Sequence, residues 1–203
     1  MNTNNHMSGY LELILGPMFS GKTSKILDLY KQCEYSNSPV VVINHTSDKR
    51  YSETMLSTHD LKMIPCIQAN NLFDLTVTDG STSEQITKSK VILINEGQFF
   101  NDLYDWVLHM VECEKKEVYV CGLDGDFNRK KFGGILDLIP VCDKVVKLKS
   151  ICSICRNGTK AIFSLRVTND TEQVLIGSDC YKPVCRNCYW KDHLEKLHKQ
   201  KSA

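Results

Sequence analysis

A glycine-rich motif near the N-terminus has the composition of a phosphate-binding loop. Residues 16–23 read Gly-Pro-Met-Phe-Ser-Gly-Lys-Thr and match the P-loop pattern Gly-x-x-x-x-Gly-Lys-Ser/Thr. Glycines let main-chain N–H groups turn inward around phosphate oxygens, and a helix that starts at the motif adds the positive end of its dipole. We expect Lys22 to reach the β- and γ-phosphates of a nucleoside triphosphate, and Thr23 to hold Mg²⁺. The rest of the cradle is expected from Gly16, Pro17, Met18, Phe19, Ser20 and Gly21.

An acidic residue follows a run of four aliphatic residues. Residues 91–94 are Val-Ile-Leu-Ile, and Asn95 and Glu96 come next. A strand that ends in an acid is the usual second half of a P-loop site, and a carboxylate beside the γ-phosphate can accept the proton of an attacking hydroxyl. We therefore predict that Glu96 is a catalytic base rather than a surface acid. Asn95 stands where an aspartate normally helps to hold Mg²⁺, so we expect weaker metal binding, with Asp48 as a candidate for helping the metal.

Two Cys-x-x-Cys pairs lie in the C-terminal quarter of the chain. Cys152 and Cys155 form one pair, Cys185 and Cys188 form the other, and 29 residues separate the pairs. Each pair can turn both sulfurs toward one ion, and two pairs complete the tetrahedral thiolate set of a structural zinc site. Four thiolates leave no open position on the metal. We therefore predict a structural Zn²⁺ that has no direct part in the chemistry.

Strands and helices alternate over the first three quarters of the sequence. Apolar runs predict strands at residues 11–15, 39–43, 91–94, 118–121 and 145–148, and helical spacing predicts helices at residues 23–35 and 102–112. This alternation is typical of βα units, so the fold class is α/β, with a P-loop parallel sheet flanked by helices. The polar residues 70–90 are expected to form a helix end and a loop.

The pattern changes after Ser150. Short alternating stretches at residues 161–167 and 173–176, separated by a polar turn, lie between the two cysteine pairs. We expect a small zinc-held β module there. The predicted organisation is a nucleotide-binding domain over residues 9–149 and a zinc module over 150–192, with flexible termini at 1–8 and 193–203.

Composition narrows the function classes. The formal net charge is +1 and no basic stripe is present, which argues against a nucleic-acid-binding protein. No apolar run has the length of about 20 residues that spans a bilayer, and the N-terminus has no signal-peptide core. Ten cysteines, four of them paired for a metal, fit a reducing compartment. We expect a cytoplasmic protein with no membrane contact.

Taken together, these motifs make the chain resemble the type II thymidine kinases over residues 10–190. The resemblance covers the P-loop with its Pro-Met-Phe insert and both cysteine pairs. Four further segments carry it: Asp-Lys-Arg-Tyr at 48–51, Ser-Thr-His-Asp at 57–60, Asn-Glu-Gly-Gln-Phe-Phe at 95–100, and Gly-Leu-Asp-Gly-Asp-Phe at 122–127, with Arg129, Lys130 and Phe132 after it.

The resemblance implies a role for each matching position. Glu96 would deprotonate the 5′-hydroxyl of the nucleoside, and Asp48, Arg50 and Asn95 would join the ATP and phosphate contacts. Ser164 stands where the family usually has threonine beside the thymine methyl group. A lasso loop would fold over the base. The implied nucleoside pocket and lasso residues are Met18, Phe99, Leu123, Phe127, Phe132, Ser164, Val174, Gly177 and Tyr181.

The implied activity is transfer of the ATP γ-phosphoryl group to thymidine, with Mg²⁺ as a cofactor and Zn²⁺ as a structural ion. Serine at position 164 makes discrimination against deoxyuridine weaker. The resemblance also implies a homotetramer and feedback inhibition by thymidine triphosphate. Two alternatives stay open: the acceptor is another deoxynucleoside or a nucleoside monophosphate, or the chain is a zinc-ribbon ATPase that binds nucleic acid.

Overall fold

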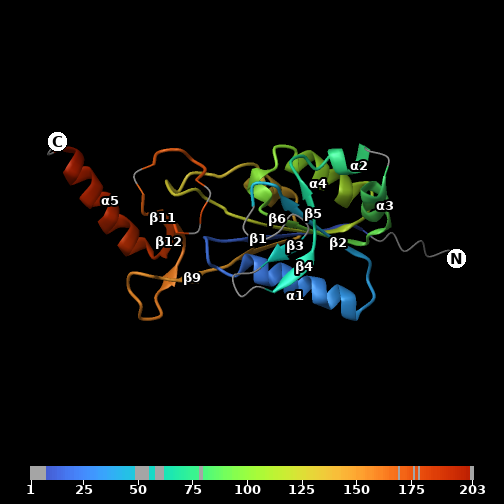
Figure 1. The fold of residues 1–203 in the computed structure, drawn as a ribbon, viewed down its shortest axis with the longest axis horizontal. Helices are drawn as coiled ribbons and strands as arrows, with labels where there is room; N and C mark the ends of the chain where they lie inside the picture. Colours follow the sequence, from blue (N-terminus) through green and yellow to red (C-terminus); the bar gives the residue numbers. More distant parts are fainter. Residues whose placement is uncertain are drawn as a thin grey trace.

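One parallel sheet forms the centre of the molecule (Figure 1). A computed structural model describes residues 8–48, 55–57, 62–77, 80–168, 170–175, 177 and 179–201, with side chains up to residue 195. Six strands lie in the order β5-β2-β6-β7-β1-β8, and every neighbouring pair is parallel. Their bounds are Ile67–Ala69 (β5), Val40–His45 (β2), Val91–Asn95 (β6), Glu117–Gly122 (β7), Tyr10–Leu15 (β1) and Lys144–Lys147 (β8).

The five strands expected from the apolar runs are all present, as β1, β2, β6, β7 and β8. The inner strands are buried on both faces, which is why they read as continuous apolar runs rather than as alternating ones. Strand β5 was not expected, because its three residues, Ile67–Ala69, carry no apolar run. The α/β fold class with a parallel sheet is therefore confirmed.

Helices cover both faces of the sheet (Figure 1). Helix α1, Lys22–Tyr35, packs Ile26 and Leu27 against one face, and helix α4, Leu103–Glu112, packs Trp106 against the other. Each face of the sheet has its own hydrophobic core. Side chains alternate along a strand, so Leu13 of β1 packs in the core on the α4 side and Ile14 packs in the core on the α1 side. Burying each such side chain contributes about 1.5–3 kcal/mol.

The polar segment before β6 is more helical than expected. It forms α2, Asp74–Val77, and α3, Ser81–Lys88, where the sequence analysis predicts a helix end and a loop. Within α3 only Ile86 is buried. A helix with a single buried position shows no apolar stripe in its sequence, so its periodicity could not be recognised.

The C-terminal part is a small β module followed by a helix. Short antiparallel pairs join β9, Ser150–Ile151, to β10, Lys160–Ala161, and β11, Phe163–Arg166, to β12, Tyr181–Val184. Helix α5 runs from Arg186 to Lys201, through much of the stretch expected to be a flexible tail. In Figure 1 this module and α5 lie to one side of the sheet.

One predicted strand of the module is absent. Residues 173–175 form a loop, whereas the sequence analysis predicts a strand over residues 173–176. The guanidinium of Arg166 donates to the main-chain oxygens of Asp170, Glu172 and Gln173, so these carbonyls bond a side chain instead of a neighbouring strand. Alternation of side chains could not reveal this competitor.

A short antiparallel pair also lies beside the sheet: β3, Met55–Ser57, and β4, Met63–Pro65. It packs Leu56 and Ile64 on the α1 side of the core. Two 3₁₀ helices follow β6 and precede β8: η1, Gly97–Phe99, and η2, Ile135–Val141. No helix among the described residues combines the length and apolar character needed to cross a membrane.

Candidate active site

One cavity of about 360 Å³ joins the P-loop, the end of β6 and the C-terminal module. All nine positions expected to bind the nucleoside line it, although they come from five separate segments of the chain. Glu96 and the P-loop from Met18 to Thr23 line the same cavity. Gly16, Pro17 and Asn95 are not among the described residues that line it, and Arg50 lies outside the described residues.

The P-loop runs from the end of β1 to the first turn of α1. A Cβ atom on Gly16 would lie 2.8 Å from both the Leu148 carbonyl oxygen and Ser20 Oγ, so only glycine fits there. Gly21 has φ 87°, a left-handed conformation that glycine adopts without strain. These two positions let the loop curl back tightly before the helix starts.

Polar groups of the P-loop are arranged around the cavity. Lys22 Nζ donates to the carbonyl oxygens of Gly16, at 3.0 Å, and Pro17, at 2.9 Å. The Ser20 hydroxyl is buried and has no hydrogen-bond partner among the described residues. A buried hydroxyl without a partner is costly unless a ligand satisfies it. Together with the dipole of α1, it fits a bound phosphate.

Four oxygen-bearing side chains line the cavity together with Lys22. Thr23 and Ser24 come from α1, and Ser47 and Asp48 come from the segment after β2; all four line the cavity. Hydroxyl and carboxylate oxygens are the ligands that Mg²⁺ prefers. The residues present therefore fit a magnesium ion next to the phosphate cradle.

Asn95 lies beneath this site instead of facing it. It is only 1% exposed, and its Nδ2 donates to Asn44 Oδ1 at 2.9 Å. The pairing follows from the sheet register, which sets Asn44 on β2 directly opposite Asn95 on β6. An amide pair of this kind joins two strands and carries no charge.

Glu96 occupies a tight turn between β6 and η1. Its backbone has φ 53° and ψ 42°, in the left-handed region that non-glycine residues rarely adopt. Its carboxylate lines the cavity, and its Oε2 accepts a hydrogen bond of 2.6 Å from Gln98 Nε2. The sharp turn places an acid at the carboxyl end of the sheet, next to the P-loop.

Aromatic and aliphatic side chains form the wall farther from the phosphates. Phe99 and Phe132 meet edge to face with their ring centroids 5.4 Å apart. Leu123 and Phe127 line the same cavity from the segment after β7. Flat apolar surfaces with a few polar groups suit a planar base.

The segment between β11 and β12, with the first residue of β12, lines the cavity on the side of the C-terminal module. Val174, Gly177 and Tyr181 line it. Gln173 Nε2 donates to Asp126 Oδ2 at 2.9 Å, which joins this segment to the one after β7. Arg166 is 2% exposed, binds the Tyr181 hydroxyl, and lies 3.8 Å over the Phe127 ring. Arg166 thus holds both the covering segment and one aromatic wall.

Ser164 connects the C-terminal module to the P-loop. Its Oγ accepts a hydrogen bond of 2.9 Å from the Met18 main-chain N–H, and its side chain is buried at the cavity wall. This contact is an addition to the role expected from the resemblance, which placed Ser164 beside the base. A hydroxyl in this position is tied to the phosphate loop at one end of the cavity.

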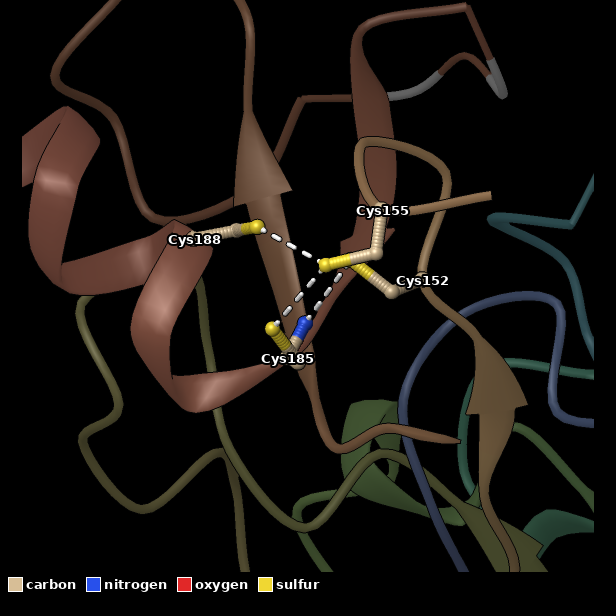
Figure 2. A group of neighbouring side chains, drawn as sticks. All are labelled: Cys152, Cys155, Cys185 and Cys188. Atoms are coloured by element: carbon tan, nitrogen blue, oxygen red, sulfur yellow. Dashed lines mark hydrogen bonds between the residues drawn. The ribbon is translucent and has the colours of Figure 1, made fainter. Parts of the chain in front are cut away.

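The four paired cysteines converge, as Figure 2 shows. Their sulfurs all lie within 4.8 Å of one another, and Cys155 Sγ is 3.8 Å from Cys185 Sγ and 3.4 Å from Cys188 Sγ. A tetrahedral zinc site with bonds of about 2.3 Å has sulfur–sulfur edges of about 3.8 Å. The cluster therefore fits a Zn²⁺ ion.

Main-chain groups favour the ionised form of one cysteine of the cluster, Cys152, whereas contacts with the other thiols raise the pKa values of Cys155 and Cys188. Burial opposes ionisation of Cys152, but N–H groups of Cys155, Cys185 and Ile154 outweigh it and lower the pKa of Cys152 to about 6. The Cys185 N–H donates to Cys152 Sγ at 3.3 Å. A thiolate favoured near neutral pH is the ligand form that zinc requires.

The residue after the last cysteine reaches the cavity wall. The Tyr189 hydroxyl donates to the Phe127 carbonyl oxygen at 2.7 Å, and its ring packs with Phe163 at 5.2 Å. Arg129, two residues after Phe127, lies 4.4 Å over the Tyr189 ring. The cysteine cluster is therefore connected to a cavity aromatic through one side chain.

Sequence reasoning missed several residues of the cavity lining. Gln98 and Gly125 stand inside motifs that were quoted, but neither received a role. Asp126 and Gln173 meet only in the fold, across 47 residues of sequence, so no local pattern could pair them. The lining residues that were not predicted are Ser24, Ser47, Gln98, Gly125, Asp126, Gln173 and Leu175.

Comparison with known proteins gives a consistent family. The thymidine kinase family model matches residues 9–189. The chain is 39% identical over 188 residues to thymidine kinase a of Arabidopsis thaliana, covering 92% of this chain and 77% of that protein. It is 38% identical to the thymidine kinase of Yaba monkey tumor virus (92% and 98% covered) and 40% identical to that of vaccinia virus strain Western Reserve (89% and 97% covered). The matched range includes the P-loop, Glu96 and all four clustered cysteines.

Proposed function

The chain belongs to the thymidine kinase family, and we propose that it transfers the γ-phosphoryl group of ATP to the 5′-hydroxyl of thymidine. The observation that carries the proposal is the single cavity in which the P-loop, Glu96 and all nine expected nucleoside residues meet. A phosphate cradle and a wall for a planar base in one cavity can bring a triphosphate and a sugar alcohol into contact.

Glu96 acts as the base in this proposal. Its carboxylate takes the proton of the 5′-hydroxyl while the oxygen forms a bond to the γ-phosphorus, and the bond from that phosphorus to the bridging oxygen of ADP breaks. Lys22 and the N–H groups of the P-loop stabilise the charge that develops on the phosphoryl oxygens. The products are thymidine 5′-phosphate and ADP.

Magnesium would be held by Thr23 with help from Asp48, both of which line the cavity. When bound, the ion neutralises charge on the transferred phosphoryl group. The four cysteines would hold zinc in a purely structural role, because four thiolates leave no position for substrate.

The covering segment explains why phosphoryl transfer to a sugar would outcompete transfer to water. Residues 173–175, with Tyr181 beside them, line one wall of the cavity, and Arg166 holds the segment through three main-chain oxygens. A segment that covers a bound substrate in this way would exclude water from the γ-phosphate.

Two further properties are proposed from family membership. Thymidine triphosphate would inhibit, since a phosphate cradle and a wall suited to a planar base lie in one continuous cavity. The chain would assemble as a homotetramer, which light scattering of the purified protein tests directly. A monomer at micromolar concentration would contradict the assembly, and an unchanged rate with thymidine triphosphate would contradict the inhibition.

The deciding experiment measures phosphoryl transfer from labelled ATP to a panel of nucleosides and nucleoside monophosphates. We expect thymidine to be the best acceptor, followed by deoxyuridine, and Glu96→Gln to lower kcat by about 10²–10⁴-fold with little change in thymidine affinity. If a different acceptor is preferred, thymidine is not the substrate. If DNA stimulates ATP hydrolysis and no nucleoside is phosphorylated, the protein is a nucleic-acid-binding ATPase instead of a kinase. A wild-type kcat in Glu96→Gln would remove Glu96 as the base.

A further inference from the structure

The side chain of Gln98 bridges the proposed base and the nucleoside wall. It is 3% exposed, its Nε2 donates to Glu96 Oε2 at 2.6 Å, and its Oε1 accepts from the Leu123 N–H at 2.9 Å. We infer that Gln98 is a positioning residue, which fixes the Glu96 carboxylate in the orientation that accepts the proton of the acceptor hydroxyl. The inference rests on the proposed function of Glu96 as base.

The orientation of the Gln98 amide follows from the chemistry of its neighbours. A main-chain N–H can only donate, so the group that faces Leu123 must be the amide oxygen. The NH₂ group is then directed to Glu96, where an ionised carboxylate can only accept. Neither hydrogen bond survives a flip of the amide, which makes the arrangement unique.

Close packing leaves the Gln98 side chain no second position. A Cβ atom on Gly122 would lie 2.5 Å from Gln98 Oε1, so the amide rests directly on the backbone of β7. A Cβ on Gly133 would lie 2.0 Å from the Gln98 main-chain oxygen, and Gly133 has φ 59°. Two glycines, one at the end of β7 and one shortly before η2, thus make room for this one glutamine.

The hydrogen bond from Gln98 matters because it acts directly on the carboxylate of the proposed base. Glu96 sits at a left-handed residue between β6 and η1, and its long side chain has several rotatable bonds. A hydrogen bond from a buried amide selects one rotamer of the Glu96 side chain. Because Leu123 lines the nucleoside wall, the same amide sets the base in register with the sugar.

The sharpest test is Gln98→Glu. This substitution keeps the length, the shape and the acceptor for the Leu123 N–H, but it replaces the donor to Glu96 with a second carboxylate oxygen. Two carboxylates in contact share a proton, so the last proton leaves the pair at a higher pH than it leaves a single carboxyl. We expect kcat at pH 7 to fall at least about tenfold. We also expect the acid limb of the kcat–pH profile to move up by about one unit or more, with KM for thymidine nearly unchanged.

The other charged groups near Glu96 are the same in the wild-type protein and in Gln98→Glu. A difference between their kcat–pH profiles therefore reports on the contact between residues 96 and 98. Lys22 and Asp48 share the cavity with Glu96 from the P-loop side, and Asp126 and Tyr181 share it from the opposite side. The imidazole of His45 and the thiol of Cys121 are within electrostatic reach of Glu96 from β2 and β7. Gln85→Glu, which adds the same charge on an exposed position of α3, is the matched control and should leave the profile unmoved.

A double-mutant cycle separates positioning from folding. In a Glu96→Gln background, Gln98→Glu should cost little further kcat, because the group it acts through is gone. An equal loss of kcat in both backgrounds would show that Gln98 merely supports the fold, and the inference would be overturned. If Gln98→Glu does not fold, Gln98→Met keeps the volume and removes the donor. It should then lower kcat in the wild-type background only.

A carboxyl ¹³C titration by NMR gives a readout independent of turnover, with the Glu96 resonance assigned by its loss in Glu96→Gln. A raised titration step in Gln98→Glu supports the contact, and a wild-type titration overturns it even if thymidine is phosphorylated. If the wild-type protein phosphorylates no nucleoside, the proposed function fails and the inference fails with it. If it does so with a pH profile that Gln98→Glu leaves unchanged, the inference alone fails.

Discussion

At the scale of single residues, Lys22 has two tasks. Its ammonium is largely buried and donates to two carbonyl oxygens of its own loop, so it shapes the cradle before any phosphate arrives. A charge held in this way needs little rearrangement when it turns to an anion, and electrostatic groups that are already in place are the most effective in catalysis.

Lys22→Ala should therefore abolish turnover, with a loss of at least about 10²-fold in kcat. Steady-state transfer from labelled ATP measures the loss, and Lys31→Ala, on the exposed part of the same helix, is the control expected to behave as wild type. A Lys22→Ala protein that keeps kcat within a few-fold of wild type would contradict a role for the ammonium.

Asn95 makes a second prediction at this scale. It is paired with Asn44 where a carboxylate would add negative charge beneath the metal region. In Asn95→Asp, the Asn44 amide can rotate so that its NH₂ donates to the new carboxylate, and the added charge should lower the Mg²⁺ concentration needed for half-maximal rate. Asn101→Asp, on an exposed turn, controls for net charge. An unchanged or higher Mg²⁺ requirement in Asn95→Asp would disprove the prediction that Asn95 weakens metal binding.

At the scale of elements, the C-terminal module touches the substrate wall through Tyr189. The residue directly follows a clustered cysteine at the start of α5, and its hydroxyl holds the carbonyl of Phe127. The cysteine cluster thereby fixes where Phe127 stands, although no cysteine is among the described residues that line the cavity.

Tyr189→Phe removes that hydroxyl and keeps the ring that packs on Phe163. One hydrogen bond contributes about 0.5–1.5 kcal/mol, so KM for thymidine should rise roughly two- to tenfold, with kcat and zinc content close to wild type. Steady-state kinetics measure KM and kcat, and a colorimetric assay measures the zinc content. Tyr104→Phe on α4 serves as the control. A lower kcat at unchanged KM would contradict a role in nucleoside binding.

Sequence reasoning recovered elements whose physics is local. The inner strands were found because burial on both faces leaves an apolar run, and the P-loop and cysteine pairs were found because their spacing is short. The helix Ser81–Lys88 was missed because it has no apolar stripe. The strand expected at residues 173–176 does not form over residues 173–175, where the Gln173 carbonyl accepts a hydrogen bond from Arg166. Contacts between distant segments, such as Gln98 with Leu123, Ser164 with Met18 and Tyr189 with Phe127, have no local signature.

At the scale of the whole molecule, the cavity is lined by residues of both the P-loop part of the chain and the C-terminal module. The hydrogen bond from the Met18 N–H to Ser164 ties the P-loop to the module, and Gln173 ties the covering segment to Asp126. Residues of the P-loop domain and of the C-terminal module both line the cavity, so the integrity of the module should govern binding of the proposed nucleoside more than ATP binding.

Removing zinc tests this division. A structural zinc site contributes about 10–16 kcal/mol in small zinc peptides, so chelation should unfold the module first and raise KM for thymidine while the sheet stays folded. Hydrogen exchange followed by mass spectrometry should show loss of protection at Phe163–Arg166 and Tyr181–Val184, with β1 and α1 still protected. Added Zn²⁺ should restore both signals. An unchanged KM in metal-free protein, or loss of protection throughout the sheet at the same time, would contradict the division.

The left-handed backbone at Glu96 lowers the stability of the fold at a position where the proposed activity needs a carboxylate. An L-residue in this region costs roughly 1–2 kcal/mol, and glycine or asparagine there would recover part of that cost. A library selected only for heat resistance or soluble yield would therefore enrich replacements at this position, and every one of them would lack the proposed base. The more stable variants of this protein would be inactive. Protein engineering for stability would therefore have to screen for phosphorylated product at every round.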